Sequence, residues 1–163
     1  MNFDDLQSKK EYDPWKAYGQ SKLANVLFTR ELARRLAAAG DNGVSTASVH
    51  PGVVRTELGR NFFIPPSMCE AAGSVECKGQ LPTAAMVAGA VSLPAMLYGT
   101  KSVPQGAMTQ VRLAADPELK GKLGGNFFMD CAQADTSGPG KDMAAAARLW
   151  KVSEELTGRQ FVV

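Results

Sequence analysis

Apolar residues recur at steps of three and four positions over residues 14–39. This spacing is typical of the buried face of an α-helix. Asp13 and Pro14 suit the first turn, because an aspartate accepts hydrogen bonds from the orphan N–H groups and proline has no N–H to leave unsatisfied there. Gly40 is a natural stop. The pattern predicts a long, half-buried helix over residues 14–39, with apolar positions at Leu23, Val26, Leu27, Phe28, Leu32 and Leu36.

A short segment with β-branched residues, 44–50, follows this helix after a turn at residues 41–43. It ends abruptly at Pro51-Gly52, a sequence that favours a turn. A helix followed by a strand indicates an α/β crossover if a parallel partner strand lies upstream, and no convincing partner is found there. We expect residues 44–50 to form a strand that leads to a site at the Pro51-Gly52 turn.

Further elements are expected towards the C-terminus. Residues 105–115 favour a helix, residues 126–129 a short strand, and residues 142–156 a final amphipathic helix. Residues 132–140 are expected to form a loop. Residues 55–102 are interrupted repeatedly by glycine and proline, which favours an irregular insertion with short helices. The pattern predicts a helix-rich α/β protein with few strands.

Charge and cysteine content exclude some classes of function. The 18 basic and 16 acidic residues give a net charge of +2 and are interspersed, which argues against a nucleic-acid partner. Cys69, Cys77 and Cys131 form no CxxC pair and His50 is the single histidine, so no metal site is expected. Free thiols indicate a reducing, intracellular compartment. The apolar run at residues 84–97 contains a proline and is too short to span a bilayer, although peripheral membrane contact stays open.

Tyr18 and Lys22 are four residues apart on the expected helix, so their side chains share one face. A phenol has an ordinary pKa of about 10, and a nearby ammonium group lowers it. Such a phenol can exchange a proton with a carbonyl or alcohol oxygen. The same spacing occurs by chance in many helices, so the pair alone is weak evidence. Ser21 is a poor candidate nucleophile, because no acid accompanies it.

The sequence around Tyr18 and Lys22, together with a second motif downstream, strengthens the functional interpretation of the pair. Residues 18–25 read Tyr18-Gly19-Gln20-Ser21-Lys22-Leu23-Ala24-Asn25, and residues 49–56 read Val49-His50-Pro51-Gly52-Val53-Val54-Arg55-Thr56. This combination resembles the retinol dehydrogenase-like branch of the short-chain dehydrogenase/reductase family, in which a Y-x-x-x-K helix precedes a strand ending in P-G. The resemblance is strongest over residues 3–60 and weakest over residues 61–101. It implies the C-terminal portion of a partial Rossmann-like doubly wound α/β fold.

The resemblance also implies roles for individual residues. Tyr18 would be the general acid/base, and Lys22 would assist it and bind the nicotinamide ribose. The expected cofactor is NADP(H), with NAD(H) as the alternative, and the substrate would be a carbonyl or alcohol. The apolar character of residues 55–101 favours a lipophilic, retinoid-like or steroid-like substrate. Relatives in this family dimerise through the helix that corresponds to residues 14–39. Besides Tyr18 and Lys22, the cofactor would contact Pro51, Gly52, Val53, Val54 and Thr56.

Parts of the family pattern have no counterpart in this sequence. Gly121 and Gly124-Gly125 follow the Y-x-x-x-K motif, whereas the family's dinucleotide-binding glycines precede it. The upstream asparagine and serine of the catalytic group are also unmatched. We therefore expect residues 1–163 to form a single, incomplete NAD(P)-binding domain with a lid-like insertion at residues 55–102, inactive alone. Two alternatives stay open: a non-catalytic interaction or dimerisation module derived from this fold, and an incomplete gene model.

Overall fold

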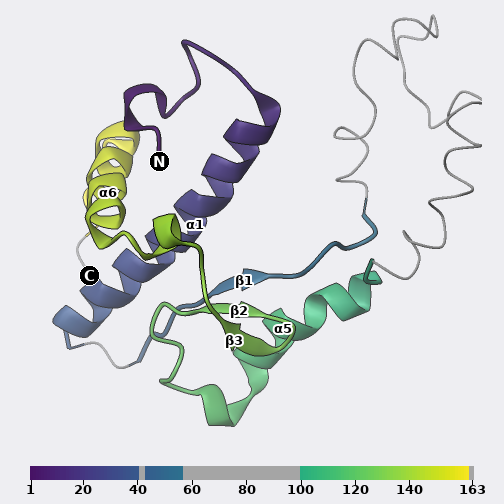
Figure 1. Cartoon of the computed structure of the whole chain (residues 1–163). Coiled ribbons are helices and arrows are strands. Elements are labelled where there is room, and N and C mark those ends of the chain that lie inside the picture. The colour runs from purple at the N-terminus through teal and green to yellow at the C-terminus, as the bar shows by residue number, and fades with distance from the viewer. Residues whose placement is uncertain (41–42, 57–99, 162–163) are drawn as a thin grey trace, which may run out of the picture. The chain divides into compact units, whose positions relative to one another are not determined.

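The computed structural model of this chain describes residues 1–40, 43–56 and 100–161 (Figure 1). These residues fall into two compact units. One unit comprises Met1–His50 with Met108–Val163, and the other comprises Pro51–Ala107. Each unit is described by itself. Most of the insertion expected at residues 55–102 lies outside the described residues, so the expectation of short helices and a lid stays a prediction.

Helix α1 spans Pro14–Ala38, which confirms the predicted helix to within one residue. Asp13 caps its first turn, because the Asp13 Oδ1 atom accepts a hydrogen bond of 2.8 Å from the Lys16 N–H group. Beyond the last turn, Gly40 has a φ angle of 72°, a left-handed conformation that glycine adopts without strain. The helix is therefore delimited by the local signals that the sequence contains.

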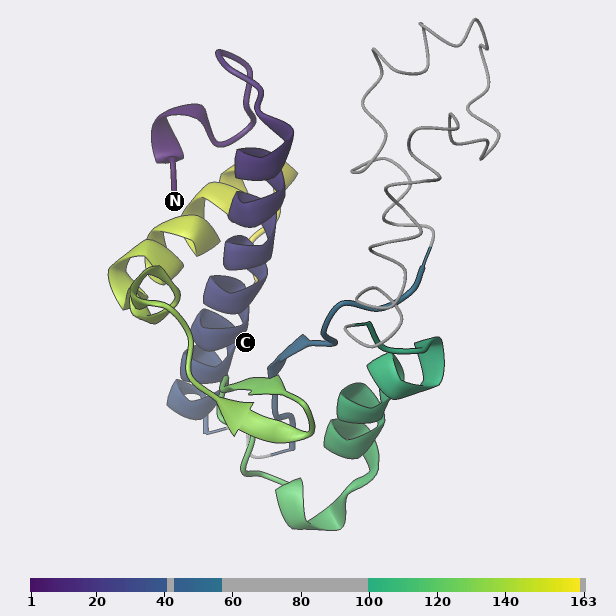
Figure 2. The same ribbon diagram turned by 45° about the vertical axis from the view of Figure 1, so that its right-hand side comes forward.

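The hydrophobic core lies between α1 and helix α6, Met143–Thr157, which lie side by side in the ribbon views (Figures 1 and 2). Leu27 of α1 and Ala146 of α6 are fully buried, and Leu149 is nearly so. Burial of one leucine contributes about 2 kcal/mol, so this contact accounts for much of the attachment of α6. The partly buried residues around this centre are Met1, Phe3, Leu6, Leu23, Ala24 and Ala145.

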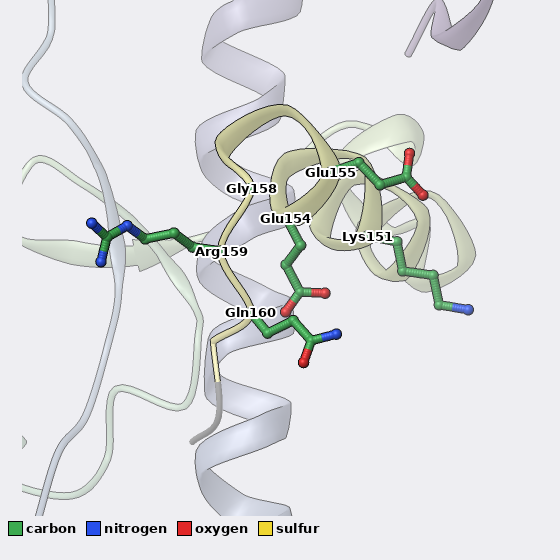
Figure 3. A pocket seen from close by; sticks show the side chains of 6 residues that line it. All are labelled: Lys151, Glu154, Glu155, Gly158, Arg159 and Gln160. Atoms are coloured by element: carbon green, nitrogen blue, oxygen red, sulfur yellow. The ribbon is translucent and has the colours of Figure 1, made fainter.

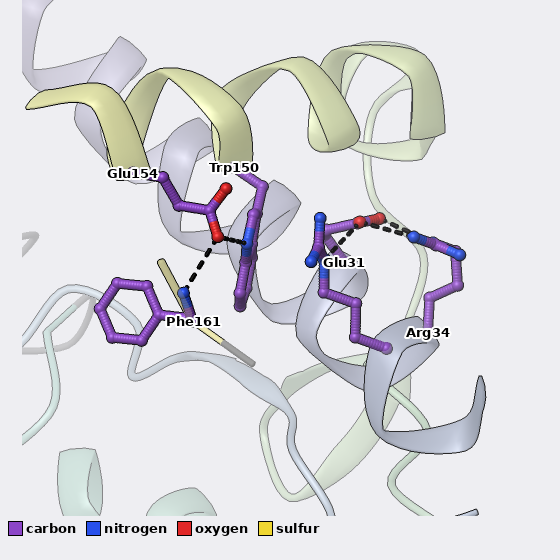
Figure 4. A network of polar contacts seen from close by, with 6 residues as sticks. Glu31, Arg34, Trp150, Glu154 and Phe161 are labelled. Carbon is purple, nitrogen blue, oxygen red and sulfur yellow. Dashed lines mark hydrogen bonds and ion pairs between the residues drawn. The ribbon is translucent and has the colours of Figure 1, made fainter. Parts of the chain in front are cut away.

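Trp150 of α6 joins this core to the C-terminal residues (Figure 4). Its ring stacks on Phe28 of α1, with centroids 5.3 Å apart, and the guanidinium of Arg35 lies 4.4 Å from the ring centroid. Glu154 accepts two hydrogen bonds of 3.0 Å each, one from Trp150 Nε1 and one from the Phe161 N–H group. Trp150 thereby connects α1, α6 and the end of the chain.

A second polar group in this region is Glu31 of α1, whose side chain is 0% exposed (Figure 4). Its carboxylate accepts hydrogen bonds from Arg34 Nη2 at 2.7 Å and Arg34 Nε at 2.8 Å, and from Arg35 Nε at 2.9 Å. The hydrogen bonds from Arg34, assisted by Arg35, lower the pKa of Glu31 below its ordinary value of 4.5, although burial acts in the opposite direction. The buried carboxylate is therefore stable only in company with both arginines.

Lowering the pH should destabilise the fold, because it protonates the carboxylate of Glu31. Because the pKa of Glu31 is lower in the folded than in the unfolded state, its contribution is fully present above the unfolded pKa of about 4.5 and is lost as the pH falls through the folded pKa. We expect Glu31→Gln to be less stable at neutral pH but to lose less stability on acidification. Urea unfolding over a series of pH values measures this, with exposed Glu155→Gln as control. Parallel pH curves for the wild type and Glu31→Gln would contradict the assignment.

Strands β1, Ser48–His50, β2, Phe127–Met129, and β3, Ala132–Ala134, form one sheet in the order β1-β2-β3. Strands β1 and β2 are parallel, with Val49 opposite Phe128, and β2 and β3 are antiparallel. Strand β1 therefore has a parallel neighbour later in the chain, whereas the residues described before α1 contain no strand that would complete a crossover through α1.

The strand expected at residues 44–50 begins only at Ser48. Before that point the chain beside it turns at Gly124-Gly125, where the Gly125 N–H group donates to the Thr46 carbonyl at 2.8 Å. A continuous ladder cannot extend past this turn. The prediction of a loop over residues 132–140 is also wrong in part, because Ala132–Ala134 form β3 and Gly138–Lys141 form a 3₁₀ turn. The other expected elements are confirmed as α5, Val103–Ala115, β2 and α6.

The β2-β3 hairpin turns through Asp130 and Cys131, whose φ angles are 52° and 60°. Hairpin turns with two left-handed residues favour Asn-Gly or Asp-Gly, because a Cβ atom is strained in that conformation. Here Thr109 accepts a hydrogen bond of 3.1 Å from the Cys131 N–H group, and Arg112 Nη1 donates to the Cys131 carbonyl at 2.6 Å. Contacts from α5 therefore hold a turn that its own sequence does not favour.

Cys131→Gly should stabilise the protein by about 1 kcal/mol, because glycine removes the left-handed strain and keeps both backbone hydrogen bonds. Denaturant unfolding measures the change. Cys131→Ala is the matched control, because it removes the thiol and keeps a Cβ atom in the strained conformation. Equal stabilities for the glycine and alanine variants would show that the turn is not strained.

Candidate functional site

Tyr18 and Lys22 are brought together on the N-terminal half of α1. Lys22 Nζ lies 5.2 Å from the centroid of the Tyr18 ring, so ammonium and phenol occupy one face of the helix, as the spacing predicted. Tyr18 is 36% exposed and can be reached by a small molecule. The hydroxyl of Ser21 donates a hydrogen bond of 2.7 Å to the Tyr18 carbonyl. Ser21 thus bonds to a carbonyl group of its own helix.

The N-terminal residues are fastened to the same helix by Gln20. Gln20 Oε1 accepts a hydrogen bond of 2.8 Å from the Asn2 N–H group, and Gln20 Nε2 donates to the Leu6 carbonyl at 3.3 Å. Phe3 packs its ring under the guanidinium of Arg148, 4.3 Å away, on α6. These contacts fix residues 2–6 against α1 and α6 and leave the Tyr18 side of α1 accessible.

The residues expected to contact a cofactor lie in the other unit, on the segment Pro51–Thr56. Gly52 has a φ angle of 83°, which explains glycine at this turn. The segment is paired with Lys101: the Lys101 N–H group donates to the Val53 carbonyl at 2.8 Å, and the Arg55 N–H group donates to the Lys101 carbonyl at 3.0 Å. A parallel bridge between Val54 and Lys101 results. No local sequence pattern predicts this pairing, because a long insertion separates its partners.

Gly106 of α5 supports the same segment. A Cβ atom at Gly106 would lie 2.5 Å from Val54 Cγ2, so only glycine lets the first turn of α5 approach this closely. That turn is capped reciprocally: the Ser102 N–H group donates to Gln105 Oε1 at 2.8 Å, and the Gln105 N–H group donates to Ser102 Oγ at 3.4 Å. Residues 101–106 therefore hold segment 51–56 in place through backbone pairing and close packing.

A hollow of about 380 Å³ lies at the C-terminal end of α6 (Figure 3). None of the predicted site residues lines it: its lining residues are Lys151, Glu154, Glu155, Gly158, Arg159 and Gln160. In the described ranges, no three His, Cys, Asp or Glu side chains gather as metal ligands would. A search of the helices in the same ranges finds none with the length and apolar character needed to cross a membrane.

Comparison with known proteins identifies relatives over nearly the whole chain. No family model matches it. Human retinol dehydrogenase 14 is 37% identical over 97% of this chain, and mouse retinol dehydrogenase 12 is 37% identical over 99%. The chicken WW domain-containing oxidoreductase is 34% identical over 94%. The chain spans 40%, 42% and 30% of the lengths of these three relatives, respectively.

These relatives show that the chain is homologous to a part of the short-chain dehydrogenase/reductases. The α/β arrangement and the Tyr-x-x-x-Lys pair on a helix agree with this class. Within that class it is similar to retinol dehydrogenases. The resemblance inferred from the sequence and the partial Rossmann-like fold are thereby confirmed. The names of these relatives describe dehydrogenases and an oxidoreductase.

Proposed function

We propose that this chain supplies the proton-transfer part of an NADP(H)-dependent short-chain oxidoreductase that interconverts a lipophilic alcohol and its carbonyl compound. The observation that carries the proposal is the ammonium group of Lys22 at 5.2 Å from the Tyr18 ring on one helical face. The names of the relatives favour a retinoid as substrate. The apolar composition of residues 55–101 favours a lipophilic substrate as well.

In the proposed reaction, Tyr18 holds the proton that moves. During reduction of a carbonyl compound, the Tyr18 hydroxyl gives its proton to the oxygen of the substrate, and during oxidation the phenolate takes it back. The ammonium group of Lys22 stabilises the negative charge that remains on the phenol oxygen and can also donate hydrogen bonds to ribose hydroxyls. The nicotinamide, when bound, supplies or accepts the hydride.

The segment Pro51–Thr56 fits the nicotinamide end of such a cofactor. Val53 O and Arg55 N are used in the pairing with Lys101, so the N–H and C=O groups of Val54 point to the opposite edge of the segment. A carboxamide carries one acceptor and one donor group, and these two backbone groups can satisfy both. The hydroxyl of Thr56 adds a further polar group beside them. This arrangement supports the assignment of Pro51, Gly52, Val53, Val54 and Thr56 as cofactor contacts.

Turnover tests the proposal. The purified chain and a chimera that joins it to the part of human retinol dehydrogenase 14 it does not match would be incubated with retinal and NADPH. Retinol formation is then measured by chromatography. We expect activity from the chimera, little activity from the chain alone, and less activity with NADH. A folded chimera that binds NADPH but reduces neither retinal nor a steroid ketone would contradict the proposal.

A second candidate function is dimerisation through α1. Trp15 is 62% exposed on this helix, and contact with a second copy would cover its ring. Sedimentation of the wild type and Trp15→Glu measures this. A dimer that dissociates in the variant supports the interface. A monomer at all concentrations contradicts it.

A further inference from the structure

The side chain of Lys101 covers the turn at Gly52. A Cβ atom built on Gly52 would meet Lys101 Cε and Nζ at 3.0 Å each and Lys101 Cδ at 3.1 Å. The ammonium group therefore lies directly against the turn, and its aliphatic stem packs along it. The φ angle of 83° favours glycine at position 52, and the absence of a Cβ atom leaves the space that the Lys101 side chain occupies.

The main chain that carries this ammonium group is held in place by hydrogen bonds. Hydrogen bonds to Val53 and Arg55 hold the main chain of Lys101 on both sides. The capped first turn of α5 follows directly, and Gly106 lets that turn pack against Val54. Groups that must hold a ligand need such support, because a loosely held lysine loses several rotatable bonds of freedom on binding.

We propose that Lys101 is a binding residue for a phosphate oxygen of the dinucleotide cofactor, an assignment that rests on the proposed function for its ligand. A dinucleotide carries a diphosphate a few bonds from the nicotinamide ribose. If the turn at Gly52 holds the nicotinamide end, an ammonium group beside that turn would be within reach of the diphosphate. Lysine binds phosphate as a compact positive charge with three donors. Arg55, next to the turn, adds to the positive charge of this segment.

The competing interpretation is that Lys101 serves only as packing for Gly52. Two substitutions separate charge from packing. Lys101→Met keeps the aliphatic stem and removes the charge, and Lys101→Arg keeps the charge. Lys120→Met, at an exposed lysine of the other unit, controls for the loss of one positive charge. Denaturant unfolding of each variant establishes that it is folded before binding is compared.

The first measurement uses the ¹⁵N-labelled chain and inorganic pyrophosphate. We expect saturable amide shifts at Gly52, Val53 and Lys101 in the wild type and in Lys120→Met. Lys101→Met should bind about tenfold more weakly or worse, because one charge-assisted hydrogen bond is lost, and Lys101→Arg should retain most of the affinity. Absence of shifts at Gly52 in the wild type, or equal affinity of Lys101→Met, would overturn the proposal.

The second measurement uses the retinal-reducing chimera. Lys101→Met should raise KM for NADPH about tenfold while kcat and KM for retinal change little, and Lys101→Arg should restore KM. An unchanged KM for NADPH in an active chimera would overturn the role of Lys101 and leave the proposed function standing. An inactive chimera whose chain still binds pyrophosphate through Lys101 would instead refute the proposed function and support the anion site.

Discussion

Tyr18→Phe in the retinal-reducing chimera should lower kcat by about a hundredfold to ten-thousandfold, the range that general acid–base catalysis contributes. Phenylalanine keeps the ring and its contact with Lys22 and removes only the hydroxyl that moves the proton. The affinity for NADPH should therefore change little. Steady-state kinetics gives kcat, and calorimetric titration gives the dissociation constant of NADPH.

A matched control is Tyr12→Phe, which removes a hydroxyl from a tyrosine that is exposed just before α1. It should leave kcat unchanged. If Tyr18→Phe turns over like the wild type, Tyr18 is not the proton donor. If Tyr18→Phe loses NADPH affinity and kcat together, Tyr18 acts in cofactor binding, and another group must move the proton.

The pair could be predicted from the sequence because every step depends on local information. Asp13, Pro14 and Gly40 mark the ends of α1, and helical periodicity alone places side chains four residues apart on one face. No distant contact is needed to bring Tyr18 and Lys22 together. The same reasoning explains why α5 and α6 were predicted to within two residues.

The sheet, and the pairing of segment 51–56 with residues 101–106, could not be predicted. Both depend on contacts between residues that are far apart in the sequence. Strand β1 is shortened by a turn that lies far along the chain, and the Asp130-Cys131 turn lacks the glycine that signals a hairpin. Lys101 contacts Gly52 although a long insertion separates the two residues in the sequence, and no local pattern predicts that contact. The sequence therefore predicted that Tyr18 and Lys22 share one helical face and that a turn lies at Gly52, and it missed the lysine that covers this turn.

Gly125→Ala should lower the free energy of unfolding by about 3 kcal/mol, more than any other glycine-to-alanine change in the described residues. This is a large fraction of the stability of a small domain. Gly125 is buried with a φ angle of 75°. A Cβ atom there would lie 2.8 Å from Ala33 Cβ and 3.2 Å from Arg30 Cα. Arg30 Cα belongs to the helix backbone and cannot move aside as a flexible side chain can. Gly125 therefore has a packing role, which its position after the Y-x-x-x-K motif could not reveal.

Gly124→Ala separates backbone strain from packing. Gly124 has a φ angle of 51°, but its nearest neighbour, Asn126 Nδ2, is 3.7 Å from the added Cβ position. This variant should cost about 1 kcal/mol, from the left-handed conformation alone. Ala33→Gly, which costs about 1 kcal/mol in a helix interior, should cost less in the Gly125→Ala background than in the wild type, because it removes the nearer clash there. Equal stabilities of the two glycine variants in urea unfolding would mean that α1 does not pack on this turn. In that case, the contact between Gly125 and α1 would not be what holds the parallel β1-β2 pair beside α1.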